Sequence, residues 1–310
     1  MVEDRRNSLV IKKRIHIKGG YIKVKFIQFI GGDSVRLGIK TEKGIIDVKQ
    51  CATLLSVDVP TTMEQVIVGG EEALLQLKQL TMKEVPYVSE EEMVYAPCIT
   101  QPEKIICVGL NYIDHAKESN MEIPSSPVLF SKFNNALSAH KQEIDLPKNA
   151  EHFDYEAELI IVIGKEAFNI SKEDALSYVF GYTVGNDLSA RDLQFRTGQW
   201  LLGKTCDQFA PTGPYLVTAD ELDPTNLDIE LKVNGEVKQS ANTRDMIFDC
   251  ATIVSYLSQH MTLKPGDIIF SGTPDGVILG YPEEQRVWLK SGDEVQVTIE
   301  NIGTLTNVLK

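Results

Sequence analysis

Short apolar segments separated by turn residues fill the chain from residue 98 onward, and this pattern most limits the folds open to it. Seven segments have the length and texture of β-strands: 104–109, 128–131, 157–163, 180–186, 228–233, 267–272 and 294–299. Two others, 172–178 and 246–260, have helical spacing. Strands and helices do not alternate regularly, and neither a GxGxxG motif nor a P-loop occurs, which argues against nucleotide-binding α/β folds. We therefore predict an α+β fold that is mainly β.

A different pattern precedes residue 98. Apolar and polar residues alternate over 22–48, with turns at 31–33 and 42–44, which predicts an antiparallel meander of three strands. Residues 63–80 then carry apolar side chains at helical spacing, broken by Gly69-Gly70. The predicted organisation is a flexible basic extension at 1–21, a small α+β domain at 22–97 and a larger domain at 98–310.

Composition excludes several classes of protein. Lys and Arg number 31 and Asp and Glu 44, so the formal net charge of −13 opposes nucleic-acid binding. Five widely spaced cysteines without a CxxC pair indicate reduced thiols and a cytoplasmic protein. The longest nearly apolar run, 159–163, is far shorter than the roughly 20 residues of a membrane span. Neither a membrane nor a nucleic acid is expected as a partner.

Three carboxylates are the first candidates for chemistry. Glu156 and Glu158 are two residues apart at the start of an apolar strand, so their side chains share one face. Asp187 follows the next predicted strand. A solvated edge strand would accommodate these like charges, and so would a hard divalent cation such as Mg²⁺ or Mn²⁺. Spacing alone does not decide whether the three side chains converge.

Three motifs together resemble those of the fumarylacetoacetate hydrolase family: YEAELIIVIGK at 155–165, GNDLSARD at 185–192 and SGTPDGV at 271–277. The resemblance covers roughly residues 99–310. It implies a rolled, mixed β-sheet catalytic domain and one Mg²⁺ or Mn²⁺ per subunit, held by Glu156, Glu158 and Asp187. It also implies a small anionic oxo-acid substrate and a homodimer.

A second group of residues matches the family's lid segment, expected here at 111–122. The resemblance implies that His115 and Glu118 form a dyad that activates water. Their spacing of three residues places them on one face of a helical turn. Histidine exchanges protons near neutral pH, and a neighbouring carboxylate would orient it.

Positive groups are also required, because the substrate is an anion and an enolate develops during the reaction. By resemblance, Lys204, Arg191 and Gln194 would stabilise that enolate. The turn that contains Gly272 and Thr273 would offer N–H groups and a hydroxyl to the substrate carboxylate. Lys132 is a further, less distinctive candidate for substrate binding.

The predicted function is divalent-metal-dependent hydrolysis of the C–C bond of acylpyruvate-type 2,4-dioxo acids, which gives pyruvate and a carboxylic acid. The same site could instead decarboxylate oxaloacetate or isomerise a 2-oxo-dienoate, since these reactions share a metal-stabilised enolate. A catalytically idle scaffold protein is an alternative from a different class. The pair His115 and Glu118 favours hydrolysis.

Overall fold

The computed structural model describes residues 24–118 and 122–310; the predicted extension at 1–21 and residues 119–121 of the predicted lid lie outside these ranges. The first described part is an antiparallel meander of β1 (Lys25–Gly31), β2 (Ser34–Thr41) and β3 (Gly44–Asp47). Two helices follow it, α1 (Val48–Leu55) and α2 (Met63–Thr81), and their apolar faces pack on the meander. Helix α1 has no counterpart among the predicted elements, whereas α2 does and is kinked at Gly70.

The larger part is built mainly from strands. These are β4 (Ile105–Gly109), β5 (Val128–Lys132), β6 (Leu137–Ala139), β7 (Phe153–Asp154), β8 (Ala157–Ile163), β9 (Val179–Asn186), β10 (Ser189–Ala190), β11 (Ala210–Thr212), β12 (Leu216–Thr218), β13 (Asp228–Val233), β14 (Glu236–Asn242), β15 (Ile268–Phe270), β16 (Glu294–Ile299) and β17 (Gly303–Val308). The helices are α3 (Ile113–Glu118), α4 (Lys172–Ala175), α5 (Arg191–Gln194), α6 (Leu201–Lys204) and α7 (Cys250–His260). The α+β, mainly β prediction is thus confirmed.

Each predicted strand is present, with ends that differ by two residues at most. The strands that sequence reasoning missed are very short or carry few apolar residues; β14, for example, reads EVKQSAN. Helix α7 begins four residues later than predicted because the carboxylate of Asp249 caps it, accepting a hydrogen bond from the Thr252 N–H. The segment 172–178 is α4 followed by a single 3₁₀ turn.

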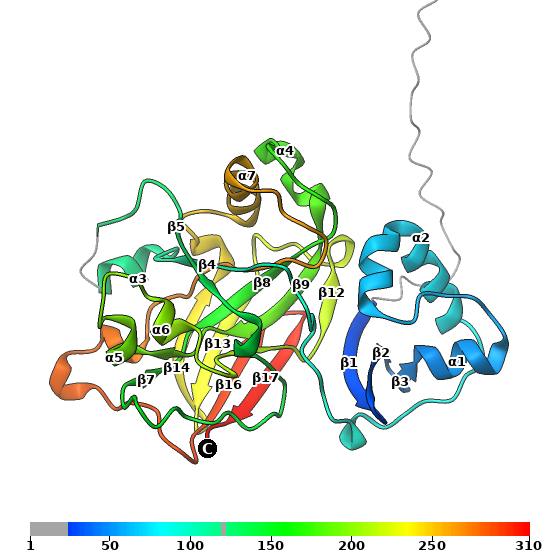
Figure 1. Ribbon diagram of the computed structural model, residues 1–310, viewed down its shortest axis with the longest axis horizontal. Coiled ribbons are helices and arrows are strands. Elements are labelled where there is room, and N and C mark those ends of the chain that lie inside the picture. The colour runs from blue at the N-terminus through cyan, green and yellow to red at the C-terminus, as the bar shows by residue number, and fades with distance from the viewer. Residues whose placement is uncertain (1–23, 119–121) are drawn as a thin grey trace, which may run out of the picture.

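An 11-stranded sheet runs through both parts (Figure 1), in the order β3-β2-β1-β12-β9-β8-β15-β4-β5, with β11 and β6 attached beside β9. A second sheet has the order β14-β13-β16-β17. Strand β1 pairs with β12, so backbone hydrogen bonds connect the N-terminal meander to the larger part. Strand pairing therefore crosses the boundary predicted near residue 98, and the domain division itself remains a prediction.

Strand β8 is buried on both faces, which explains its continuous apolar sequence. Leu159, Ile161 and Ile163 belong to one core, and Ile160 and Val162 belong to the other. Glu158 has the same parity as Ile160 and Val162, so it lies on their face at the end of the strand. Among the described residues, no helix has both the length and the apolar character needed to cross a bilayer.

Candidate active site

The pairing of β8 with β9 brings the three predicted carboxylates together. The two strands are antiparallel, with Ala157 opposite Asn186, so the start of β8 lies beside the end of β9. Glu156, Glu158 and Asp187 each offer a carboxylate oxygen within 4.8 Å of the others, and none of them is more than 6% exposed. We call these three residues the acidic triad. A solvated edge, the alternative considered from sequence, is inconsistent with this burial.

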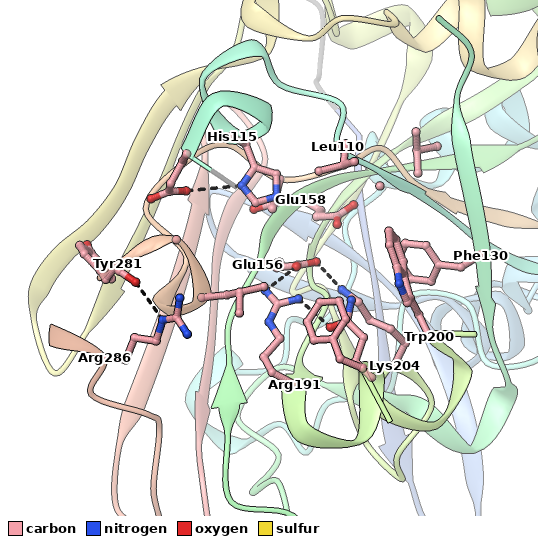
Figure 2. A pocket seen from close by; sticks show the side chains of 18 of the residues that line it. Leu110, His115, Phe130, Glu156, Glu158, Arg191, Trp200, Lys204, Tyr281 and Arg286 are labelled. Carbon is pink, nitrogen blue, oxygen red and sulfur yellow. Dashed lines mark hydrogen bonds and ion pairs between the residues drawn. The ribbon is translucent and has the colours of Figure 1, made fainter. Parts of the chain in front are cut away.

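Lys204 and Arg191 contact the acidic triad directly (Figure 2). Lys204 Nζ lies 2.6 Å from Glu156 Oε2 and 3.0 Å from Asp187 Oδ2. Arg191 Nη2 lies 2.7 Å from Glu156 Oε1. Burial by itself would raise the pKa of Glu156, but Lys204 and then Arg191 outweigh it and lower that pKa to about 2.

Asp154 is a buried carboxylate that sequence reasoning missed, although it lies in the same acidic segment. Its Oδ2 accepts hydrogen bonds from Arg191 Nε at 2.9 Å and from the Leu279 N–H at 3.0 Å. Its Oδ1 accepts from the N–H groups of Tyr155 and Ile278. Asp154 therefore fixes the Arg191 guanidinium and ties it to the segment after the SGTPDGV motif.

Gln194 and Arg191 are also joined, since Arg191 Nη1 donates to Gln194 Oε1 at 2.8 Å. The Arg191 guanidinium thus contacts two carboxylates and one amide oxygen. This geometry makes Arg191 a residue that positions Glu156, rather than the free cation for the enolate that its sequence motif suggested. Gln194 and Arg191 still line the cavity.

Lys132 lies behind Asp187 and is absent from the cavity lining. Its Nζ donates to the backbone carbonyls of Leu188 at 3.1 Å, Phe209 at 2.8 Å and Lys204. An ammonium has three protons, so these carbonyls occupy all of them. The approach of Nζ to Asp187 Oδ1, 2.6 Å, is therefore a charge contact only. Lys132 has the geometry of a positioning residue and not of the substrate contact predicted from sequence.

The acidic triad fits a hard divalent cation. Asp187 Oδ1 is buried and has no hydrogen-bond donor among the described residues. Burial first, and then the charges of Asp187 and Glu156, raise the pKa of Glu158 well above its usual range. A cation bound at these oxygens would relieve both features, and carboxylate oxygens are the ligands that Mg²⁺ and Mn²⁺ prefer.

Gly272 supports the acidic triad rather than the substrate. Its N–H donates to Glu158 Oε2 at 2.6 Å. This N–H is therefore already used, whereas we had predicted that it would bind the substrate carboxylate. Its φ of 99° and a Cβ position only 2.6 Å from Asn111 Cβ explain why glycine is required here. Thr273 does line the cavity, and its Oγ1 accepts from Gln239 Nε2 at 2.9 Å.

His115 and Glu118 lie on α3, on one wall of the same cavity. His115 Nδ1 is 3.5 Å from Glu118 Oε2. The Gly276 N–H donates to both carboxylate oxygens of Glu118, at 3.1 and 3.2 Å, and so holds this side chain in place. The lid was predicted to have few anchors, yet Asn111 at its start is fully buried and hydrogen-bonds Phe248 and Ser271. Its mobility remains a prediction, since residues 119–121 lie outside the described ranges.

The cavity that these groups line has a volume of about 550 Å³. Figure 2 shows Phe130 and Trp200 on one side of the acidic residues and Tyr281 and Arg286 on the other. Sequence reasoning missed these four residues. They carry no motif, and only the folded chain brings their loops and strands to the cavity.

Comparison with known proteins agrees with this architecture. Residues 104–310 match the model of the family described as "Fumarylacetoacetate (FAA) hydrolase C-terminal". A Rattus norvegicus protein named "Oxaloacetate tautomerase Fahd2a, mitochondrial" is 44% identical over 250 residues, which are 80% of this chain and 79% of that protein. A "Fumarylacetoacetate hydrolase domain-containing protein 2 homolog" from Dictyostelium discoideum is 43% identical and covers 94% of this chain and 98% of its own.

Solved structures are similar as well. A putative HpcE protein from Mycobacterium smegmatis has a TM-score of 0.81 and 33% identity, covering 92% of this chain and 98% of that chain. A fumarylpyruvate hydrolase from Pseudomonas aeruginosa, solved with Mn²⁺ and pyruvate, has a TM-score of 0.62 and 34% identity, covering 68% of this chain and 90% of that chain. The chain belongs to the fumarylacetoacetate hydrolase family of enzymes.

Proposed function

We propose that this protein interconverts the enol and keto forms of oxaloacetate in a reaction that depends on one Mg²⁺ or Mn²⁺ per subunit. This proposal revises the prediction of acylpyruvate hydrolysis in favour of the alternative substrate, oxaloacetate. Relatives about 44% identical over most of their length are named oxaloacetate tautomerases, which favours that substrate. Those names also include the word mitochondrial, so the cytoplasmic location remains only a prediction from composition.

One observation carries the proposal: an electron-withdrawing centre and a proton carrier line the same cavity. Lys204 lies between Glu156 and Asp187, and His115 faces the same space. Tautomerisation needs these two functions and nothing more, because the enol oxygen loses a proton while C3 gains one. A divalent ion held by the acidic triad would supply Lewis acidity toward the 2-oxo group and its carboxylate.

The chain's own residues then have separate tasks. His115 takes the proton from the enol oxygen and returns a proton to C3, and Glu118 stabilises the imidazolium between these events. Lys204 places a positive charge beside the oxygen that carries the developing negative charge. Asp154 and Arg191 hold Glu156 in position, and Thr273 offers its hydroxyl oxygen and backbone at the cavity wall.

The test compares two reactions in one preparation. Decay of the ultraviolet absorbance of enol-oxaloacetate, with deuterium uptake at C3 followed by NMR, measures tautomerisation; pyruvate release from acetylpyruvate measures hydrolysis. With Mn²⁺ we expect tautomerisation well above the spontaneous rate, little hydrolysis, and a strong loss in His115→Ala. Rapid pyruvate release with tautomerisation no faster than in buffer would replace this proposal with hydrolysis. Pyruvate formed from oxaloacetate itself would indicate decarboxylation.

The homodimer implied by the resemblance also stands as a proposal. Light scattering of the purified chain tests it, and a mass of one chain at micromolar concentration would refute it.

A further inference from the structure

Arg286 is the one cation of the cavity lining that forms no ion pair with a carboxylate of the described residues. The other two, Arg191 and Lys204, are both paired with Glu156. Arg286 is half-buried, and its Nε donates to the Tyr281 carbonyl oxygen at 2.8 Å. That bond uses one of five guanidinium N–H groups, so both terminal nitrogens remain for a ligand.

The opposite end of the cavity has its own charge balance. The acidic triad and Asp154 carry four negative charges, and Lys132, Lys204 and Arg191 carry three positive ones. A divalent ion would leave a single positive charge among these groups, which one substrate carboxylate neutralises, and Glu118 on α3 adds no positive charge to the cavity. A substrate with a second carboxylate therefore needs another cation, at the far end of its chain.

The segment that leads to Arg286 is anchored to that end at Ile278 and Leu279. The N–H groups of Ile278 and Leu279 both bind Asp154, which also binds Arg191. Figure 2 shows Arg286 across the cavity from Phe130 and Trp200, with Glu156 between them. A small ligand anchored at the acidic triad can thus extend toward Arg286 within one cavity.

We infer that Arg286 binds the distal carboxylate and makes the site selective for 2-oxo dicarboxylates over monocarboxylates of the same length. This inference rests on the proposed function, since it names the residue that recognises the second carboxylate of oxaloacetate. The planar guanidinium fork matches a carboxylate in two-point contact. Arg286 is a specificity residue and takes no part in proton transfer.

The test uses unreactive ligands, so that it does not depend on which reaction the enzyme catalyses. L-Malate and L-2-hydroxybutanoate have the same four-carbon chain and the same chelating end, and only malate has the distal carboxylate. Calorimetry on the Mn²⁺-loaded protein should give malate an advantage in Kd of about 10–100-fold, the size of one charge-assisted contact. Arg286→Gln should reduce this ratio to near one and leave 2-hydroxybutanoate binding unchanged.

Two further variants complete the design. Arg286→Lys keeps the charge without the fork and should retain only part of the ratio. Arg196→Gln removes an exposed arginine outside the cavity lining and should retain all of it. The inference would be overturned if the ratio of the 2-hydroxybutanoate Kd to the malate Kd stayed high in Arg286→Gln, or if it fell equally in Arg196→Gln. If the ratio behaves as expected while the wild type does not tautomerise oxaloacetate, the proposed function fails and the role of Arg286 stands.

Discussion

Replacing Asp154 by Asn tests the buried network behind the acidic triad. The two oxygens of Asp154 accept hydrogen bonds from three backbone N–H groups and from Arg191 Nε, and Arg191 Nη2 forms an ion pair with Oδ2 at 2.8 Å. Asn has nearly the same shape but replaces one oxygen with an NH₂ group, which can only donate. Whichever way the amide is oriented, that NH₂ faces at least two N–H donors.

The magnitude follows from the orientation that costs least. Keeping the amide oxygen toward Arg191 and Leu279 leaves the N–H groups of Tyr155 and Ile278 unpaired, at about 1–3 kcal/mol each. The two N–H groups together cost about 2–6 kcal/mol, and breaking a buried ion pair, which includes the cost of the groups left unpaired, typically costs about 3–5 kcal/mol. We expect a loss of about 4 kcal/mol in the free energy of unfolding. For 310 residues this corresponds to a fall in Tm of roughly 6 °C.

Thermal and urea unfolding followed by circular dichroism, without metal, would measure this loss. Asp192→Asn is the matched control: it changes the net charge equally, but among the described residues its carboxylate accepts a single hydrogen bond, from the Glu151 N–H at 3.1 Å, which an amide oxygen can keep. We expect the control to lose at most about 1 kcal/mol. Equal stability of the two variants would refute the assignment of Asp154 as the acceptor that organises this region.

Three other changes test further features of the structure. Glu158→Gln should weaken Mn²⁺ binding by more than roughly 100-fold, the loss that follows removal of a residue that only orients a ligand. It should not lower the stability of the metal-free protein, because it removes one of three buried like charges. Calorimetry measures the first effect and thermal unfolding the second. Gly272→Ala should lower Tm and Mn²⁺ affinity together, since its Cβ would meet Asn111; an unchanged Tm would contradict the packing. His140 accepts a hydrogen bond from the Thr306 N–H, and burial lowers its pKa from 6.5 to about 4. Protons therefore favour the unfolded chain, so about 3 kcal/mol of stability should be lost as pH falls from 6.5 to 4, and His140→Asn should lack this slope.

The sequence by itself determined the elements that carry the site. Continuous apolar runs marked strands such as β8, and the parity of a strand placed Glu156 and Glu158 on one face. The order of three motifs indicated the family and its acidic triad. These are properties of residues close together in the chain, where local geometry is fixed by spacing alone.

Tertiary structure decided which of those residues face the cavity. The antiparallel register of β8 and β9 brings Asp187 to the two glutamates, and spacing along the chain does not specify strand partners. Burial also changed the roles of cations: Arg191 is occupied by Asp154 and Glu156, and the protons of Lys132 go to carbonyls. Arg286, which belongs to no motif, lines the cavity without an ion pair to any carboxylate of the described residues, because residues far apart in sequence enclose it there. Charge pairing depends on distance and desolvation in the folded chain, and a linear sequence contains neither.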